Sequence, residues 1–347
     1  MPTETKNNVT IYQVAASAGV AISTVSKVLS NKRGISAATR EKVLSAVERL
    51  GYVPTLAARG LTGGQTGIIG LVFAFPPKML YRDPFLLDNI LGIEETLMEL
   101  DYNLLISTGN DQDIAVSFDR LLRGRYFDGV IIVETTEVHR QGLYQKVEQQ
   151  NLPWVLMGNP QGIPSCHAVF ADDILGGQQL AEHLLCLGHR RFSIVTSEKR
   201  PSGVDERLRS FQEVLNQHGI QVQPDEIFYG DFSKESGYQV APAILDRPNR
   251  PTAIFSVNDR MALGIIKWAQ DHGLCVPQDV SIVGFDDVQA AVEAHPSLTT
   301  IRQPGVEVGR MVARMLYNII RGEPTPQQIK LDTLFIARES SGPAPKI

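Results

Sequence analysis

The order of apolar and polar positions divides the chain into a short helical part and a long part in which strands and helices alternate. In residues 10–29, apolar side chains recur three and four positions apart on either side of Gly19. This pattern predicts two short helices joined by a tight turn, with the glycine at the left-handed position. A third helix is expected from Ser36, a good N-cap, to Gly51.

From residue 68 onward, short apolar runs alternate with amphipathic helical patterns. This alternation predicts an α/β protein with doubly wound parallel sheets that helices cover on both faces, and the number of runs indicates two such sheets side by side. The expected strands are Ile68–Phe75, Asn103–Ser107, Gly129–Val133, Trp154–Met157, His167–Phe170, Phe192–Thr196, Ala253–Ser256, Ser281–Gly284 and Lys330–Phe335. The expected helices are Asp88–Leu100, Ile114–Gly124, His139–Gln149, Leu175–Leu187, Asp205–His218, Lys234–Leu245, Asp259–His272 and Val306–Arg321.

Ligands of such folds bind at the carboxyl ends of the strands, so a cleft between two lobes is the expected pocket. The glycine-rich stretch Gly63–Gly70 does not predict a nucleotide-binding loop. It precedes a strand instead of following one, and it lacks the Gly-Lys-Ser/Thr ending.

Composition narrows the class of protein. The 347 residues are 43% hydrophobic, which is enough for large cores, and no apolar run approaches the length of a membrane span. The N-terminus shows no secretory signal. The three widely spaced cysteines predict neither a disulfide framework nor a zinc site, so we expect no metal, no cofactor and a reducing, cytoplasmic location.

Charge is distributed unevenly along the chain. Residues 1–61 hold eight Lys and Arg against three Glu, whereas the whole chain has a net charge of −5. A basic head on an acidic body indicates a polyanionic partner for the head alone. Together with the helix-turn-helix pattern, this favours DNA binding through phosphate contacts over a small helical domain without nucleic acid.

Motifs along almost the whole chain resemble one family, the lactose-repressor/galactose-repressor (LacI) family of bacterial transcription factors. The resemblance is carried by Thr10–Ala15, Ser23–Ser30, Thr39–Val43, Leu50–Pro54, Ala57–Leu61, Gly92–Glu95, Phe127–Ile131, Leu187–Arg191, Gly230–Ser233, Val257–Asp259, Val283–Asp287 and Leu298–Ile301. It implies a helix-turn-helix headpiece (1–53), a hinge helix and linker (54–65), and a two-lobed effector-binding and dimerisation domain (66–340) like a periplasmic binding protein.

The same resemblance implies how the chain divides between the two lobes. Residues 66–162 and 297–322 would form the DNA-proximal lobe, and residues 163–296 and 325–340 the distal lobe. The chain would cross between lobes near Gln161–Ser165, near His295–Thr300 and near Glu323–Gln328.

The resemblance places DNA-binding roles on the headpiece and the hinge. Ile22, Ser23 and Lys27 fall where the family's recognition helix reads base edges, although Ile22 is equally suited to packing within the head. Leu61 falls at the family's wedge position, which opens the minor groove at a central base step. The full set of expected DNA contacts is Thr10, Ile22, Ser23, Thr24, Ser26, Lys27, Asn31, Ala58, Arg59 and Leu61. Without DNA, we expect the short hinge to be largely unfolded.

Effector-binding roles fall on the cleft. Arg207 and Asp286 stand at the family's effector positions, and an arginine and a carboxylate together suit a polyhydroxyl ligand. The expected effector-binding residues are Phe85, Asp172, Arg207, Phe232, Asn258 and Asp286. For the phenylalanines, a place in the core is an equal alternative.

These observations predict a homodimeric, ligand-responsive repressor of carbohydrate-uptake or catabolic genes, bound to a near-palindromic operator at the nucleoid. A purine or another non-sugar co-repressor is the alternative effector. An enzyme is disfavoured because the sequence shows no triad or metal cluster, and Asp286 and Asp287 are too close in sequence to flank one bond. A transport binding protein is disfavoured by the basic head. The tail Ser340–Ile347 carries no heptad segment, so a tetramer is not expected.

Overall fold

The computed structural model describes residues 9–29, 34–52, 65–75, 77–109, 114–124, 126–136, 138, 142–163, 165–198 and 201–346. The proposed DNA contacts Asn31, Ala58, Arg59 and Leu61 lie outside these ranges, as does nearly all of the predicted hinge. The headpiece boundary at residue 53 and the hinge at 54–65 therefore stay predictions.

The head forms three helices, α1 (Ile11–Ala18), α2 (Ile22–Leu29) and α3 (Ala37–Leu50). The backbone N–H of Thr10 donates to Gln13 Oε1 at 2.7 Å, and Gly19 has the expected left-handed φ of 65°. Ser36 accepts a hydrogen bond from the backbone of Thr39 at the start of α3. All three helix ends thus follow local sequence signals. The helices enclose their own small core, built from Val14, Ala15, Val25, Val28, Val43, Ala46 and Tyr52.

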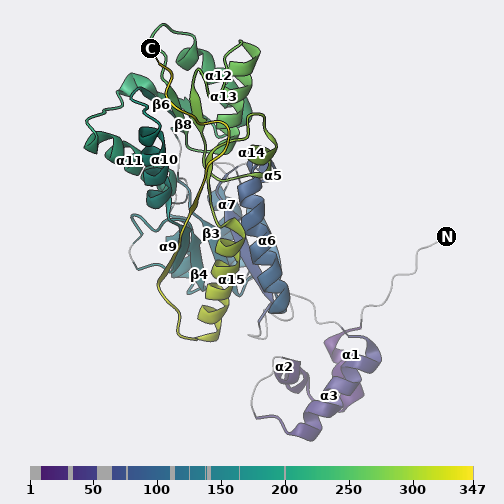
Figure 1. The fold of residues 1–347 in the computed structure, drawn as a ribbon. Coiled ribbons are helices and arrows are strands. Elements are labelled where there is room, and N and C mark those ends of the chain that lie inside the picture. The colour runs from purple at the N-terminus through teal and green to yellow at the C-terminus, as the bar shows by residue number, and fades with distance from the viewer. Residues whose placement is uncertain are drawn as a thin grey trace, which may run out of the picture.

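The body contains two parallel sheets (Figure 1). The six-stranded sheet, in the order β11-β5-β4-β3-β1-β2, defines the proximal lobe. Its strands are β1 (Ile68–Phe73), β2 (Asn103–Thr108), β3 (Gly129–Val133), β4 (Trp154–Met157), β5 (Ala168–Ala171) and β11 (Gln328–Leu331). The helices of this lobe are α5 (Pro77–Arg82), α6 (Pro84–Glu99), α7 (Ile114–Arg123), α9 (Leu143–Gln149) and α15 (Gly305–Arg321).

Helices cover both faces of the six-stranded sheet. Alternate residues of β1 point to opposite sides: Val72 packs with α7 and α9, whereas Leu71 packs with α6 and α15. The helices α6 and α15 run side by side along the second face (Figure 1). This is the doubly wound arrangement that near-continuous apolar strands predict.

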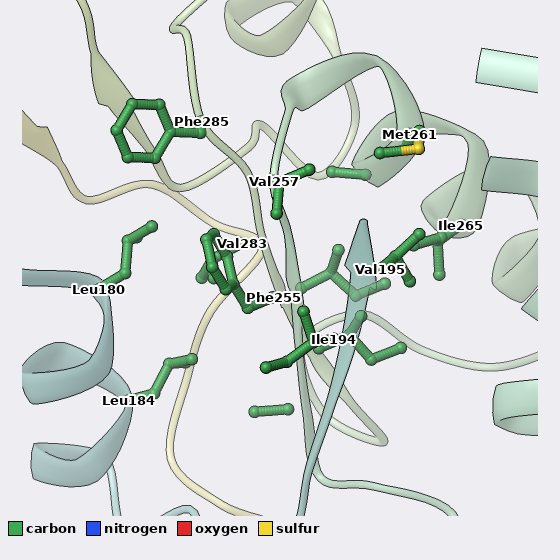
Figure 2. Packing of buried hydrophobic residues seen from close by; sticks show 14 of the residues in the cluster. Leu180, Leu184, Ile194, Val195, Phe255, Val257, Met261, Ile265, Val283 and Phe285 are labelled. Carbon is green, nitrogen blue, oxygen red and sulfur yellow. The ribbon is translucent and has the colours of Figure 1, made fainter. Parts of the chain in front are cut away.

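The distal lobe contains the four-stranded sheet, in the order β7-β6-β8-β9. Its strands are β6 (Phe192–Ser197), β7 (Ile227–Gly230), β8 (Ala253–Ser256) and β9 (Ser281–Val283). The surrounding helices are α10 (Asp173–Cys186), α11 (Ser202–Gln217), η1 (Pro224–Glu226), α12 (Lys234–Leu245), α13 (Asp259–Asp271) and α14 (Gln289–Glu293). Figure 2 shows Leu180 and Leu184 of α10 on one side of β6, and Met261 and Ile265 of α13 on the other.

A two-stranded antiparallel sheet joins β10 (Thr300–Arg302) to β12 (Leu334–Ile336). The short strands β7 and β10 were not predicted from the sequence. The single strand predicted over 330–335 is instead divided between β11 and β12, which belong to different sheets. The chain therefore changes lobe within a segment whose apolar pattern is continuous.

Strand pairing corrects the predicted division between the lobes. Strands β5 and β11 pair with each other, and β5 pairs with β4, so both belong to the proximal lobe. The predicted distal lobe, 163–296 and 325–340, wrongly includes both strands. The first crossing instead follows β5, at Asp172, and the third lies between β11 and β12. The second follows β10, a few residues beyond the predicted His295–Thr300. Hydrogen bonds between distant strands decide sheet membership, and local patterns do not report them.

Candidate functional site

The helix α2 presents one polar, exposed face away from the head's core. Val25 and Val28 are buried, whereas Ser23 and Lys27 are exposed and Ile22 retains 39% of its accessible surface. Thr24 and Ser26 are half-buried beside them, and Thr10 is exposed at the start of α1. The expected base-reading side chains Ile22, Ser23 and Lys27 are thus free of the core and lie on a single short helix.

A cavity of about 660 Å³ lies between the two lobes. Its walls come from strand ends and following loops of both sheets, which is the position expected for a ligand in this kind of fold. Of the six predicted effector residues, five line it: Phe85, Arg207, Phe232, Asn258 and Asp286. The cavity is also lined by Glu134, Asn159, Asp173 and Gln303, which were not predicted from the sequence.

Arg207 is the central polar group of this cavity. Its Nε donates to Asp173 Oδ1 at 2.5 Å, and its Nη1 donates to the carbonyl of Val257 at 3.0 Å. The same Nη1 lies 3.6 Å from Asp286 Oδ1. The guanidinium lies over the face of the Phe285 ring, and Arg207 Cζ is 3.9 Å from the ring centroid. The arginine is therefore held in a fixed orientation by two carboxylates and an aromatic face.

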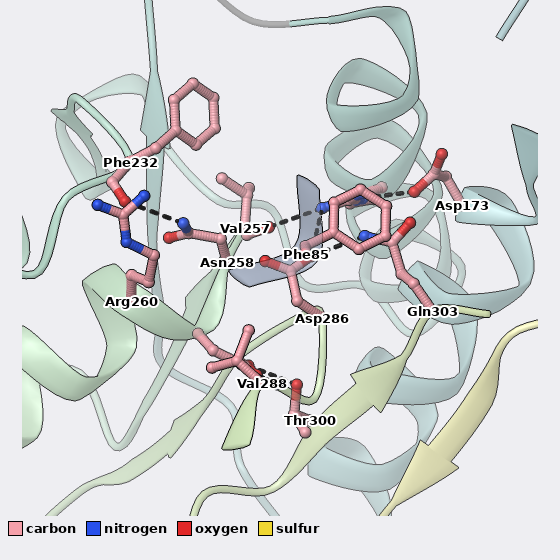
Figure 3. Close-up of polar contacts among 12 residues, drawn as sticks. Phe85, Asp173, Phe232, Val257, Asn258, Arg260, Asp286, Val288, Thr300 and Gln303 are labelled. Carbon is pink, nitrogen blue, oxygen red and sulfur yellow. Dashed lines mark hydrogen bonds and ion pairs between the residues drawn. The ribbon is translucent and has the colours of Figure 1, made fainter. Parts of the chain in front are cut away.

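Asp286 shares this polar end of the cavity. Gln303 Nε2 donates to its Oδ1 at 2.7 Å (Figure 3). Burial raises the pKa of Asp286 well above its ordinary value, although Arg207 acts in the opposite direction. The backbone φ of Asp286 is 126°, a value that residues other than glycine rarely adopt. Such strain persists only where the surrounding structure imposes it, and it is typical of ligand-binding loops.

The Asp286 loop is held by Asp259, which is fully buried at the start of α13. Val288 donates its backbone N–H to Asp259 Oδ2 at 3.0 Å, and the Thr300 hydroxyl donates to Oδ1 at 2.5 Å. Burial raises the pKa of Asp259 to about 7. Asp259 thus links the effector loop to the crossing strand β10.

Asn258 and Phe232 are joined on the distal wall. Asn258 caps α13 by accepting the backbone N–H of Met261, and its Nδ2 donates to the Phe232 carbonyl at 3.0 Å (Figure 3). Phe85 and Phe232 both contribute to the cavity wall, and Phe232 also packs against the core of the distal lobe. Phe285 is fully buried, and its ring face contacts the guanidinium of Arg207.

Asp172 is the one predicted effector residue that does not line the cavity. Its Oδ1 accepts the backbone N–H of Leu175 as the N-cap of α10, and its Oδ2 pairs with Lys330 at 2.6 Å. The next residue, Asp173, faces the cavity in its place. At the start of a helix, adjacent residues point in different directions, so a shift of one position exchanges a cap for a ligand-facing group.

Side chains of the two lobes also touch each other around the cavity. The backbone N–H of Ser202 in the distal lobe donates to Glu134 Oε2 at 3.1 Å, and Asn159 Nδ2 donates to Glu206 Oε2 at 2.5 Å. A change in the angle between the lobes must break or rearrange these contacts.

Two family models match this chain. Residues 10–55 match the model "Bacterial regulatory proteins, lacI family", and residues 181–341 match a periplasmic binding protein-like domain. A curated relative, the HTH-type transcriptional regulator CelR of Thermobifida fusca, is 34% identical over 344 residues, covering 97% of this chain and 99% of the relative. The chain belongs to the lacI family.

Further comparisons agree with this membership. The ribose operon repressor of Escherichia coli is 30% identical to this lacI-family regulator over 332 residues, covering 95% of the chain and 98% of the relative. A solved CelR–cellobiose complex is 32% identical, with a TM-score of 0.73 over 96% of this chain and 99% of that one. A lac repressor dimer bound to operator and the anti-inducer ONPF is 26% identical, with a TM-score of 0.78 over 97% and 100% of the two chains.

The relatives confirm the predicted class of protein. This lacI-family chain is a DNA-binding transcriptional regulator and not an enzyme, and regulators of this family work in the cytoplasm. Among the described residues, no helix has the length and apolarity that a membrane crossing requires.

Proposed function

We propose that this lacI-family regulator represses carbohydrate-uptake or catabolic genes, and that a sugar bound between its lobes changes its affinity for the operator. The observation that carries the proposal is the polar end of the cavity, where Arg207, Asp286 and Gln303 converge. A sugar hydroxyl both donates and accepts hydrogen bonds, so it can accept from the guanidinium and donate to the neighbouring carboxylate. The rings of Phe85 and Phe232 offer apolar surface to the C–H faces of the sugar.

The size of the cavity favours a ligand larger than one hexose. Its volume of about 660 Å³ lies well inside the range of roughly 300–1,000 Å³ that encloses a drug-sized molecule. A disaccharide belongs to that size class. The solved CelR relative is a cellobiose complex that covers nearly the whole of this chain, which makes cellobiose the first ligand to test.

We propose that the DNA-binding unit is a homodimer on a near-palindromic operator, located at the nucleoid. Two-fold symmetric half-sites require two heads, and a lac repressor dimer on operator is one of the structural neighbours. An exposed apolar stripe of Leu87, Leu91 and Met98 follows α6 at helical spacing. A stripe of this kind marks a partner surface, and we assign it to the second subunit. Sedimentation of wild type and Leu91→Glu tests the assignment, because the variant is then expected to be monomeric.

The proposed switch uses the lobe crossings and the contacts around the cavity. A ligand that binds one lobe angle more tightly shifts the population toward that angle, and only by its difference in affinity for the two states. The crossings transmit the new angle to the proximal lobe, which begins soon after the head in the sequence of each chain. The heads of a dimer then change their separation relative to two operator half-sites.

The test begins with operator sequences selected from random DNA by the full-length protein. Fluorescence anisotropy then measures operator affinity with cellobiose, ribose or hypoxanthine. We expect cellobiose to change operator affinity by about 5–150-fold, the usual range of allosteric coupling. Arg207→Ala should abolish this effect. Arg209→Ala is the matched control, because Arg209 lies on the same helix but is exposed and pairs with Glu213.

Two results would contradict the proposal. If hypoxanthine and no sugar changes operator affinity, the effector is a purine-type co-repressor. If Arg207→Ala and Arg209→Ala respond to the sugar alike, the effector does not bind at the polar end of the cavity.

A further inference from the structure

Acidic side chains outnumber basic ones among the described residues that line the cavity. Among the described lining residues, Arg207 is the single base, whereas Asp83, Glu134, Asp173 and Asp286 are acids. Arg207 is already engaged with two of these acids, Asp173 through Nε and Asp286 through Nη1. Its positive charge is therefore matched inside the protein before any ligand binds.

We propose that Asp173 is a specificity-determining residue of this regulator: by pairing with Arg207 it restricts the effector to uncharged sugars and excludes sugar phosphates and sugar acids. This inference rests on the proposed function, because it names the chemical class of effector for the same cavity. The side chains of both Asp173 and Arg207 are less than one-tenth exposed, so solvent screens their charges little.

The exclusion follows from the groups beside the guanidinium. An anionic ligand group that bonds to Arg207 would lie next to the carboxylates of Asp173 and Asp286, and like charges brought together without water are strongly unfavourable. A hydroxyl meets no such penalty, since it accepts from the guanidinium and donates to a carboxylate. Burial raises the pKa values of Asp83 and Asp286, and the nearby carboxyls of Asp259 and Asp83 raise that of Asp286 further.

Asp173→Asn and Asp172→Asn form a matched pair of substitutions for testing this role. Asp173→Asn keeps the shape of a side chain that leaves no room for a Cβ at Gly203, and it removes one negative charge from beside Arg207. Asp172→Asn removes the same charge one residue earlier, outside the cavity, and asparagine remains a good helix cap. The two variants therefore differ in whether the lost charge faces Arg207.

The first experiment uses inorganic phosphate as the probe, so it does not depend on the identity of the sugar. Melting temperatures of the full-length protein are measured in rising phosphate at constant ionic strength. We expect phosphate to raise the melting temperature of Asp173→Asn more than that of wild type and of Asp172→Asn. The double variant Asp173→Asn/Arg207→Ala should lose the gain, which separates the cavity from the basic head. Equal responses of Asp173→Asn and wild type would overturn the proposal.

The second experiment compares cellobiose with its aldonic acid, cellobionate, by calorimetry. Wild type should prefer the neutral sugar by at least about tenfold, since like-charge contacts cost several kcal/mol, and Asp173→Asn should narrow that ratio. Equal affinity of wild type for both sugars would overturn the inference even if Asp173→Asn did not fold. If no sugar changes operator affinity, the proposed function is wrong. The phosphate experiment still tests the role of Asp173 in that case, because it uses no sugar.

Discussion

Arg260 Nη1 lies 3.7 Å from Asp83 Oδ2, and this ion pair joins the two lobes beside the cavity. Asp83 caps α6 in the proximal lobe by accepting the backbone N–H of Phe85, and Arg260 belongs to the first turn of α13 in the distal lobe. Burial raises the pKa of Asp83 and Arg260 opposes that shift, so the two charges stabilise each other across the gap between lobes.

The first prediction concerns this ion pair. Arg260→Ala should weaken effector binding several-fold, because the pair favours the lobe arrangement that encloses the cavity and a partly exposed pair contributes up to about 1 kcal/mol. Calorimetry with the effector measures the change. Lys267→Ala is the control: Lys267 lies on the same helix, but it is exposed and pairs with Asp271 one turn away. Equal affinities of the two variants would show that the Asp83–Arg260 pair does not support the ligand-bound arrangement.

The second prediction concerns the recognition helix. Lys27→Ala should reduce affinity for the selected operator and relax the base preference at one position in each half-site, with a cost of about 1–3 kcal/mol if Lys27 contacts a base edge. Lys42→Ala removes the same charge from the exposed surface of α3. Binding measured over a set of single-base operator variants separates the two roles. A uniform loss over all operators, matched by Lys42→Ala, would assign Lys27 to general phosphate attraction.

The third prediction concerns the hinge. Leu61→Ala should lower operator affinity and leave effector binding unchanged, because the resemblance places Leu61 in the minor groove and the cavity residues lie far along the chain. Anisotropy with operator DNA and calorimetry with effector check the two parts. Normal operator binding by Leu61→Ala would remove the wedge role from this residue.

The fourth prediction concerns pH. Burial raises the pKa of Asp259 from its ordinary value of 3.8 to about 7, so between these pH values the folded protein binds a proton that the unfolded chain does not. The contribution of Asp259 to stability is therefore present at low pH and is lost as the pH rises toward 7, with a slope on the order of 1 kcal/mol per pH unit.

Asp259→Asn isolates this contribution, because asparagine does not titrate. The melting temperature of wild type minus that of Asp259→Asn should fall between pH 4.5 and pH 7 and then level off, a window set by the raised pKa. A constant offset is expected from the hydrogen bonds that asparagine alters at Val288 and Thr300. A difference that rises with pH over the same range would mean that the folded protein favours the charged form of Asp259.

The sequence by itself determined the features whose causes are local. Thr10, Gly19, Ser36 and Gly51 bound the helices of the head because capping depends on a few neighbouring residues. The apolar runs predicted most strands within one or two residues, since both faces of a parallel sheet are buried. Motif resemblance pointed to Arg207, Asn258 and Asp286, and all three line the cavity.

Only the tertiary structure decided which distant segments meet. The membership of β5 and β11 in the proximal sheet depends on backbone hydrogen bonds between strands more than 150 residues apart, and each strand alone is compatible with either sheet. The exchange of Asp172 for Asp173 depends on the direction in which each side chain leaves the first turn of α10. The first turn of α10 packs against α11 and the Asp286 loop, which brings Asp173 and Asp286 beside Arg207 and neutralises its charge. This contact joins segments that are distant in sequence, so no local pattern could predict it.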